Sequence, residues 1–253
     1  MNRVILFHFH FFKNAGSAVD YILEKNFGDR FVKKEFKLWP YYENIKEVIK
    51  WIENESDAVA FSSHTARLFD STLLERRGIK IIPIIFVRHP IIRIHSAYHY
   101  ERKQVDIFRP GPVIARNTDF KGYVEIRLAI PRQEFNVSNF HVFRLADMLH
   151  GEKNMKPLEK ALIALKRLPF IGLVEEFEKS MTKLEETVRE YFPEFKASVI
   201  RTNVQFSPDM PLEERLKIIK NEVGKDFYKK LMEINEEDMV LWEKVVDMYK
   251  EGF

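Results

Sequence analysis

The N-terminal part of the chain alternates short apolar segments with amphipathic ones, and this alternation constrains the fold more than any other sequence feature. Four segments have the length and composition of buried strands: residues 4–11, 31–36, 57–62 and 80–87. Four others have helical periodicity: about 16–26, 43–53, 70–76 and 90–103. Strands that alternate with helices predict an α/β fold with a central, mostly parallel sheet and helices packed on its faces.

Beyond residue 118 the pattern predicts a helix-rich C-terminal half. We expect helices at about 119–129, 138–149, 155–167, 175–191, 211–222, 224–233 and 235–250, with one buried strand at 169–174. Asp209 and Asn235 are candidate caps or turn residues. Residues 104–117 have little periodicity and contain two prolines, so they predict a long loop of the kind that covers a ligand site. No repeat or linker interrupts the chain, which predicts a single domain over residues 1–253.

The composition excludes several classes of function. The net charge of +3 argues against general nucleic-acid binding, and the absence of cysteine excludes disulfides and thiolate metal sites. His8 and His10 share one strand face, but no carboxylate lies near them in sequence, so we expect no metal. The first apolar segment is too short to span a membrane and lacks a cleavage site, which predicts a cytoplasmic protein without a membrane span.

A loop of small residues after the first strand has the properties of an anion site. Lys13 follows the strand, and the residues from Asn14 to Ser17 are small enough for backbone N–H groups to approach a phosphate. The N-terminus of the next helix favours negative charge, and Ser17 can donate a hydroxyl hydrogen bond. This is not the Walker A pattern, because the lysine precedes the glycine.

A second strand also ends on a cationic side chain. Arg88 follows the apolar segment 80–87, Pro90 fits the first turn of a helix, and Ser96 lies further along that helix. The guanidinium of an arginine can bind a phosphate through two nitrogens. Two cationic strand ends at one edge of a sheet therefore suit a ligand with two separated anionic groups. The alternative is that Arg88 caps the helix or pairs with a carboxylate while Arg93 and His95 are solvated.

These segments resemble the sulfotransferases that use 3′-phosphoadenosine 5′-phosphosulfate (PAPS), and more closely the carbohydrate type, such as heparan sulfate 2-O-sulfotransferases. The family's first motif, His-x-Pro-Lys-Thr-Gly/Ala-Gly/Ser-Thr/Ser, is similar to His10-Phe-Phe-Lys-Asn-Ala-Gly-Ser17. The second, Arg-Asp-Pro-x-x-Arg-x-x-Ser-x-Tyr, is similar to Arg88-His-Pro-Ile-Ile-Arg-Ile-His-Ser-Ala-Tyr98. Weaker likenesses follow at residues 170–177, 201–203 and 237–242.

The resemblance implies a P-loop-like three-layer sandwich that uses PAPS as co-substrate, without a metal. The residues that would hold the 5′-phosphosulfate are Lys13, Asn14, Ala15, Gly16, Ser17 and Ala18. Arg88 and Ser96 would hold the 3′-phosphate. The sulfuryl group would pass to a hydroxyl of an acceptor, such as a glycan or glycolipid. Basic residues between 102 and 132 suit an anionic acceptor, although a solvated surface explains them almost as well.

The resemblance also points to a catalytic base. His64 follows the strand 57–62, at the sheet edge where Lys13 is expected. A histidine at this place serves as the base in carbohydrate sulfotransferases, and a neutral imidazole can take a hydroxyl proton near pH 7. The alternatives are a structural loop histidine, or His10 as the base. Lys13 would stabilise charge on the leaving phosphate oxygen, and is the second candidate catalytic residue.

Two other functions remain open from the sequence. One is a nucleotide-dependent kinase of a P-loop-like fold, which would need a Walker A lysine and a magnesium ligand that are not found at the expected spacing. The other is a non-catalytic nucleotide-binding protein of the same fold, since Asn14 and His89 depart from the family motifs. The oligomeric state is not readable from the chain.

Overall fold

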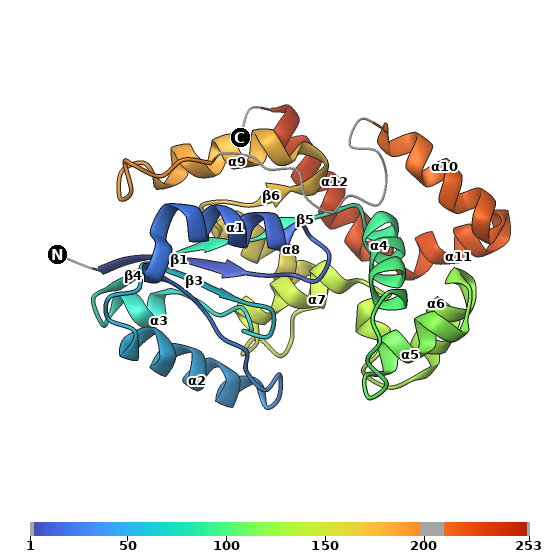
Figure 1. Cartoon of the computed structure of the whole chain (residues 1–253), viewed down its shortest axis with the longest axis horizontal. Helices are drawn as coiled ribbons and strands as arrows, with labels where there is room; N and C mark the ends of the chain where they lie inside the picture. The colour runs from blue at the N-terminus through green and yellow to red at the C-terminus, as the bar shows by residue number, and fades with distance from the viewer. Residues whose placement is uncertain (1–2, 198–209, 252–253) are drawn as a thin grey trace. The chain divides into compact units, whose positions relative to one another are not determined.

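The computed structural model describes residues 3–197 and 210–251 (Figure 1). The chain forms two compact units, each assembled from two stretches of sequence. The first unit comprises Met1–Val87 and Arg144–Arg201, and the second comprises Arg88–Phe143 and Thr202–Phe253. The two units are described in turn.

The first unit is built on a parallel sheet, as the alternating pattern predicts. Its strands are β1 (Arg3–Phe9), β2 (Phe31–Lys33), β3 (Ala60–Ser63) and β4 (Ile79–Ile84), in the order β2-β3-β1-β4. Every neighbouring pair is parallel. The expected strand 80–87 divides into β4 and β5 (Phe86–Val87), and β5 pairs in parallel with β6 (Gly172–Leu173) as a separate two-stranded sheet.

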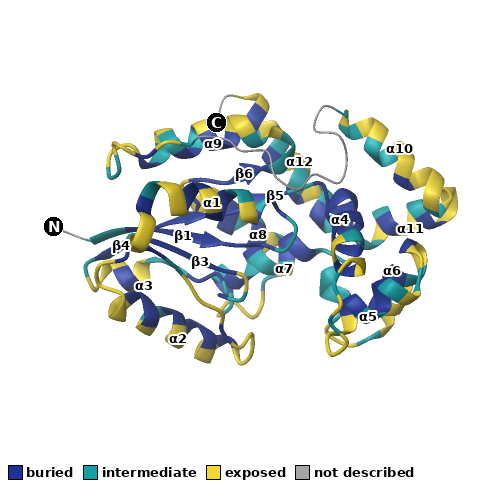
Figure 2. Ribbon diagram, viewed as in Figure 1, coloured by how far each residue is buried: buried dark blue, intermediate teal, exposed yellow. Residues whose placement is uncertain are grey.

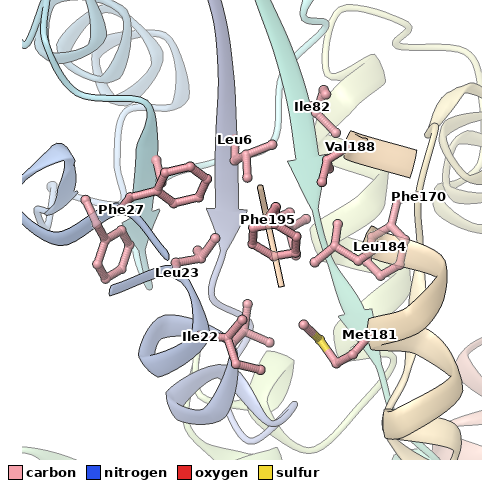
Figure 3. Close-up of a cluster of buried hydrophobic side chains, with 14 of the residues drawn as sticks. Leu6, Ile22, Leu23, Phe27, Ile82, Phe170, Met181, Leu184, Val188 and Phe195 are labelled. Atoms are coloured by element: carbon pink, nitrogen blue, oxygen red, sulfur yellow. The ribbon is translucent and has the colours of Figure 1, made fainter. Parts of the chain in front are cut away.

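Alternate residues of β1 face opposite layers of helices. Leu6 packs with Ile22 of α1 (Gly16–Phe27) and Leu184 of α9 (Phe177–Val188) in a buried cluster, which Figure 3 shows. Phe7 points the other way, and its ring centroid lies 6.2 Å from that of Trp51 in α2 (Tyr41–Asn54). Figure 2 shows that α2 buries one face and exposes the other. The unit therefore has three layers, with the sheet between helices on both faces.

The remaining elements of the first unit are short helices and turns. They are η1 (Gly28–Arg30), α3 (Thr72–Glu75), η3 (Asp147–Leu149), α8 (Pro157–Arg167) and η4 (Val174–Glu176). The helix expected at 138–149 is α7 (Phe140–Ala146) followed by the tighter turn η3. The boundary between the two units falls within α7.

The second unit is helical. Its helices are α4 (Pro90–Arg102), α5 (Pro110–Asn117), α6 (Phe120–Ala129), α10 (Leu212–Val223), α11 (Lys225–Ile234) and α12 (Glu236–Lys250), with the turn η2 (Glu134–Asn136). Helix α4 is buried over most of its length, and Tyr98 packs with Tyr123 of α6 and Ile219 of α10 (Figure 2). The predicted α/β fold with a helix-rich C-terminal half is confirmed. Over residues 3–197 and 210–251, no helix combines the length and the apolar character that crossing a membrane requires.

One local prediction was wrong. The expected loop at 104–117 ends in a helix, α5, because Pro110 occupies its first position, where the missing N–H costs no hydrogen bond. Asn235 lies at the turn between α11 and α12, as predicted, but its side chain does not cap α12. Instead its amide accepts from the Asn139 N–H and donates to the Val137 carbonyl. Asp209 and the segment 201–203 lie outside the described residues.

Candidate active site

The loop between β1 and α1 has a backbone shaped to bind an anion. Lys13 and Ala15 adopt left-handed conformations with φ of 64° and 60°, on either side of Asn14. Asn14 is buried, and its amide Nδ2 donates to the Phe12 carbonyl at 3.0 Å, which holds the turn. A backbone that alternates in handedness turns successive N–H groups toward one side, and such concavities bind anions. The loop opens directly into the N-terminus of α1 at Gly16, as predicted.

Gly16 is required by the close approach of His10. A Cβ atom added at position 16 would overlap the imidazole of His10, at its Nε2 edge. The His10 ring thus lies against the first residue of α1 and supports the loop. Burial, followed by the charges of His8 and His64, lowers the pKa of His10 to about 4, although its hydrogen bond to Asp20 opposes the shift. His10 is therefore neutral near pH 7.

The carboxylate of Asp20 lies between His8 and His10, and sequence reasoning missed it. Asp20 Oδ1 accepts from His8 Nδ1 at 2.7 Å and from the Ser62 hydroxyl at 2.6 Å, while Oδ2 lies 3.1 Å from His10 Nδ1. Burial alone would raise the pKa of Asp20, but the hydrogen bonds from His10 and His8 outweigh it and hold that pKa well below its usual range. No carboxylate lies near the two histidines in sequence, but α1 folds back over β1 and brings Asp20 to them. The sequence did contain an indication of such a partner, because His8 and His10 are polar side chains in an apolar strand and buried polar groups need hydrogen-bond partners.

Strand register brings Glu35 to His64. Lys33 of β2 lies opposite Ser62 of β3, so continuing both chains by two residues places Glu35 beside His64. His64 Nδ1 lies 2.7 Å from Glu35 Oε1, and the Thr65 hydroxyl donates to Oε2 at 2.6 Å. Burial opposes the shift, but the hydrogen bonds from His64 and Thr65 lower the pKa of Glu35 to about 2. Glu35 is therefore a carboxylate near pH 7, and the His64 ring donates its Nδ1–H to it.

The same sheet edge places His64 against His10. Phe9 of β1 lies opposite Ser63 of β3, and the next residues on each strand stack with ring centroids 3.7 Å apart. Contacts therefore run from Gly16 through His10 to His64. The side chain of His64 is 51% exposed, so the ring is accessible to solvent.

Arg144 holds the backbone around His64 in place, and no pattern in the sequence indicated this role. Its guanidinium donates to the carbonyls of Ala66 at 3.0 Å and His64 at 3.3 Å, and lies 5.0 Å from the centroid of Phe11. Burial lowers the pKa of Arg144 to about 10, which still leaves it charged. The loop that carries His64 is thus fixed on two sides, by Glu35 and by Arg144.

In the second unit, Arg88 lies two residues before the start of α4, and Ser96 is buried nearly two turns inside that helix. Arg88 is partly buried, and Pro90 begins the helix as predicted. The alternative in which Arg93 and His95 are solvated was wrong, since both are buried. Arg93 donates to the Asn136 carbonyl at 2.7 Å. The assignment of Arg88 and Ser96 to a 3′-phosphate stays a prediction from the sequence.

The fold is that of an α/β protein with a parallel sheet, and the loop after β1 has a backbone that could bind an anion at the carboxyl edge of that sheet. The chain belongs to the sulfotransferase family, whose model matches residues 3–244. The predicted sulfotransferase family is confirmed, and the protein is a transferase of sulfuryl groups, whereas the likeness to the carbohydrate type stays a prediction. Members of this family normally use PAPS as the sulfate donor. The match does not favour the kinase or the non-catalytic alternative.

Proposed function

We propose that this protein transfers the sulfuryl group of PAPS to a hydroxyl of a glycan or glycolipid, with His64 as the general base. The observation that carries the proposal is the Glu35–His64 pair. The register of β2, β3 and β1 positions this pair beside the loop between β1 and α1, which we call the phosphate loop. A carboxylate that accepts Nδ1–H leaves the lone pair on Nε2, where a hydroxyl proton can be taken.

The donor side of the proposal rests on the loop and the family. PAPS would supply the sulfuryl group and a phosphate as leaving group. The left-handed backbone at Lys13 and Ala15 and the N-terminus of α1 fit a phosphate without a metal ion. Lys13 would neutralise charge on the leaving oxygen, and Ser17, which is exposed, would donate a hydrogen bond. Arg88 and Ser96 would bind the 3′-phosphate, as the sequence resemblance implies.

In the transfer step, the acceptor oxygen bonds to sulfur while the bond from sulfur to the leaving phosphate oxygen breaks. His64 takes the hydroxyl proton at Nε2, and Lys13 stays charged throughout. The stack of His10 against His64 and Gly16 keeps the base and the loop in fixed relation. Positioning and charge neutralisation of this kind supply most of the rate in related phosphoryl transfers.

A glycan acceptor is supported by the resemblance to carbohydrate sulfotransferases and by part of the basic segment between 102 and 132. Arg102, Lys103, Lys121 and Arg132 are exposed. Arg127 is not available, because it is buried and donates to Glu101 at 2.5 Å. Arg109 is exposed but pairs with Asp106 at 2.6 Å. The basic surface is therefore smaller than the number of basic residues in this segment implies.

The family match spans both units, which supports a single sulfotransferase domain over 1–253.

The test has a binding arm and a turnover arm on the full chain. Calorimetry with adenosine 3′,5′-bisphosphate, the product nucleotide, should show binding without magnesium, and no binding of comparable affinity by ATP with magnesium. Radiolabelled PAPS should then sulfate a member of a panel of anionic and neutral glycans, glycolipids and simple alcohols. Tighter binding of magnesium ATP would overturn the donor. Turnover confined to non-carbohydrate alcohols would overturn the acceptor class and leave the donor standing.

A further inference from the structure

A second cluster of ligating side chains lies in the helical unit, between α4 and α10. His95 and His99 are four residues apart on α4, so their imidazoles lie on one face of the helix, one turn apart. Glu222, from the last turn of α10, reaches the same place. His95 Nε2 lies 2.9 Å from Glu222 Oε2 and 3.1 Å from His99 Nε2. Three ligand atoms from two helices thus converge on one point.

The three side chains are poorly matched as hydrogen-bond donors and acceptors for one another. Two neutral imidazoles that face each other through Nε2 can share only one proton, and the Glu222 oxygen is a further acceptor aimed at the same His95 nitrogen. The cluster of His8, His10 and Asp20 differs, because there the carboxylate lies between the rings and takes each through a different oxygen. In the α4–α10 cluster, His95 Nε2 instead lies within hydrogen-bond distance of both other ligand atoms.

We propose that His95, His99 and Glu222 bind a zinc-type divalent cation that links α4 to α10. Zinc takes imidazole nitrogen and carboxylate oxygen at about 2.0–2.2 Å in tetrahedral geometry, which places neighbouring ligand atoms about 3.3 Å apart. The separations of 2.9 and 3.1 Å from His95 Nε2 are a few tenths of an ångström shorter than this, and all three ligand atoms lie within 4.8 Å of one another. Two histidines at positions i and i+4 with a carboxylate from another element are an ordinary zinc ligand set.

The surrounding charges are mixed and keep both imidazoles in their ligating form. Burial and then the charge of Arg88 lower the pKa of His95 to about 4. Burial, His95, Arg102 and Lys103 lower the pKa of His99, while Glu222 opposes them. Repulsion from the three cationic side chains is offset by the carboxylates of Glu222 and Asp119, whose mutual proximity raises the pKa of Glu222 in addition to burial.

The ion would take no part in the sulfuryl-transfer step proposed above, although His95 adjoins Ser96 on α4. Its consequence is mechanical, since a shared ion fixes the last turn of α10 against α4. A cation that binds only the folded chain also raises its melting temperature, in proportion to the logarithm of the cation concentration above the dissociation constant. Folding of the helical unit is then linked to zinc supply.

The test is zinc binding to the full chain after treatment with a chelator. Calorimetry with Zn²⁺ should show one ion per chain, and Co²⁺ should give the strong visible absorption of a tetrahedral site. His99→Ala and Glu222→Gln should each weaken zinc affinity by about 10²-fold and abolish the zinc-dependent rise in Tm. Glu222 is exposed and glutamine has the same shape, so that variant keeps the fold.

Two controls keep the result specific. His150→Ala removes a histidine elsewhere in the chain that stacks on Tyr41, and zinc affinity should not change. Asp20→Asn tests the rival cluster at His8 and His10. Absence of zinc binding by the wild-type chain overturns the proposal. So does binding that survives both His99→Ala and Glu222→Gln but is lost in Asp20→Asn, which would assign the ion to the rival cluster.

Discussion

Glu35 Oε1 lies 2.7 Å from His64 Nδ1, across 29 residues of sequence. The carboxylate also accepts from the Thr65 hydroxyl at 2.6 Å and from the Thr65 N–H at 3.0 Å, so it is held as firmly as the ring that it orients. Under the proposed function, the two residues have different roles. His64 would exchange a proton with the acceptor, and Glu35 would act through His64 as a positioning residue.

Replacing His64 should remove the chemical step and little else. His64→Ala is expected to lower turnover by roughly 10²–10⁴-fold, because the hydroxyl proton loses its acceptor. Affinity for adenosine 3′,5′-bisphosphate should stay nearly unchanged, since His64 meets the acceptor and not the nucleotide. Single-turnover kinetics and calorimetry on the same preparation measure both. Near-normal turnover by a folded variant would exclude His64, and His10 would then be tested.

Replacing Glu35 should affect turnover through the orientation of His64. Glu35→Gln is expected to lower kcat by about 10–10³-fold, because an amide can hold the imidazole in the wrong tautomer. The KM for PAPS and the Tm should change little, and Glu35→Asp should recover part of the rate. Glu35 would instead be only structural if kcat stayed normal while Tm fell.

Lys13 should contribute to both donor binding and chemistry. Lys13→Ala removes the cation at the start of the phosphate loop and should lower PAPS affinity and turnover together. Lys13→Arg keeps the charge and should bind the nucleotide better than the alanine variant, while turnover recovers less because the geometry differs. Equilibrium binding and kcat, measured in parallel, test this. A loss of turnover with unchanged donor affinity would confine Lys13 to the transition state.

Arg88 should discriminate between nucleotides by their 3′-phosphate. Arg88→Ala is expected to weaken adenosine 3′,5′-bisphosphate by about 1.5–3 kcal/mol, the worth of a charge-assisted hydrogen bond. Binding of adenosine 5′-phosphate, which lacks the 3′-phosphate, should change little. Competition calorimetry with the two nucleotides gives the comparison. If both ligands weaken equally, Arg88 has a structural role.

Stability should fall as the pH drops from about 6.5 to 4. Burial lowers the pKa of His10, His89 and His95 to about 4 each, whereas the same side chains titrate near about 6.5 when unfolded. The unfolded chain therefore binds more protons in that interval, so the free energy of unfolding rises with pH there. Thermal unfolding between pH 7.5 and 4.5, with a chelator present, should show the slope.

The matched control for this slope is His89→Gln, in which one of the three groups cannot titrate. Its Tm should depend less on pH than that of the wild-type chain, whatever its absolute value. Below about pH 4.5 the depressed pKa values of Glu35 and Asp20 add a further loss, because these carboxylates are stabilising only when ionised. A Tm that rose on acidification would contradict the argument.

Local features of this chain were readable from the sequence because they depend on neighbouring residues. The 2.0 and 3.6 periodicities placed the strands and helices, and the small residues after Lys13 marked the turn into α1. The sequence around Pro110 was interpreted as a loop because proline interrupts the interior of a helix, but proline is also favoured at the first position of a helix. His64 was placed at the correct sheet edge because parallel strands end on the same side.

The partners of these residues were decided only by the tertiary structure. Glu35 reaches His64 because β2 pairs with β3 in one particular register, and a slip of one residue would turn its side chain to the other face. Asp20 meets His8 because α1 packs back over β1, and Glu222 meets His95 across 127 residues because α10 packs on α4. A hydrogen bond or a metal site depends on distances of a few tenths of an ångström. Those distances are set by the packing of whole elements, so sequence spacing predicts where reactive groups occur, while the assembled core determines which of them meet.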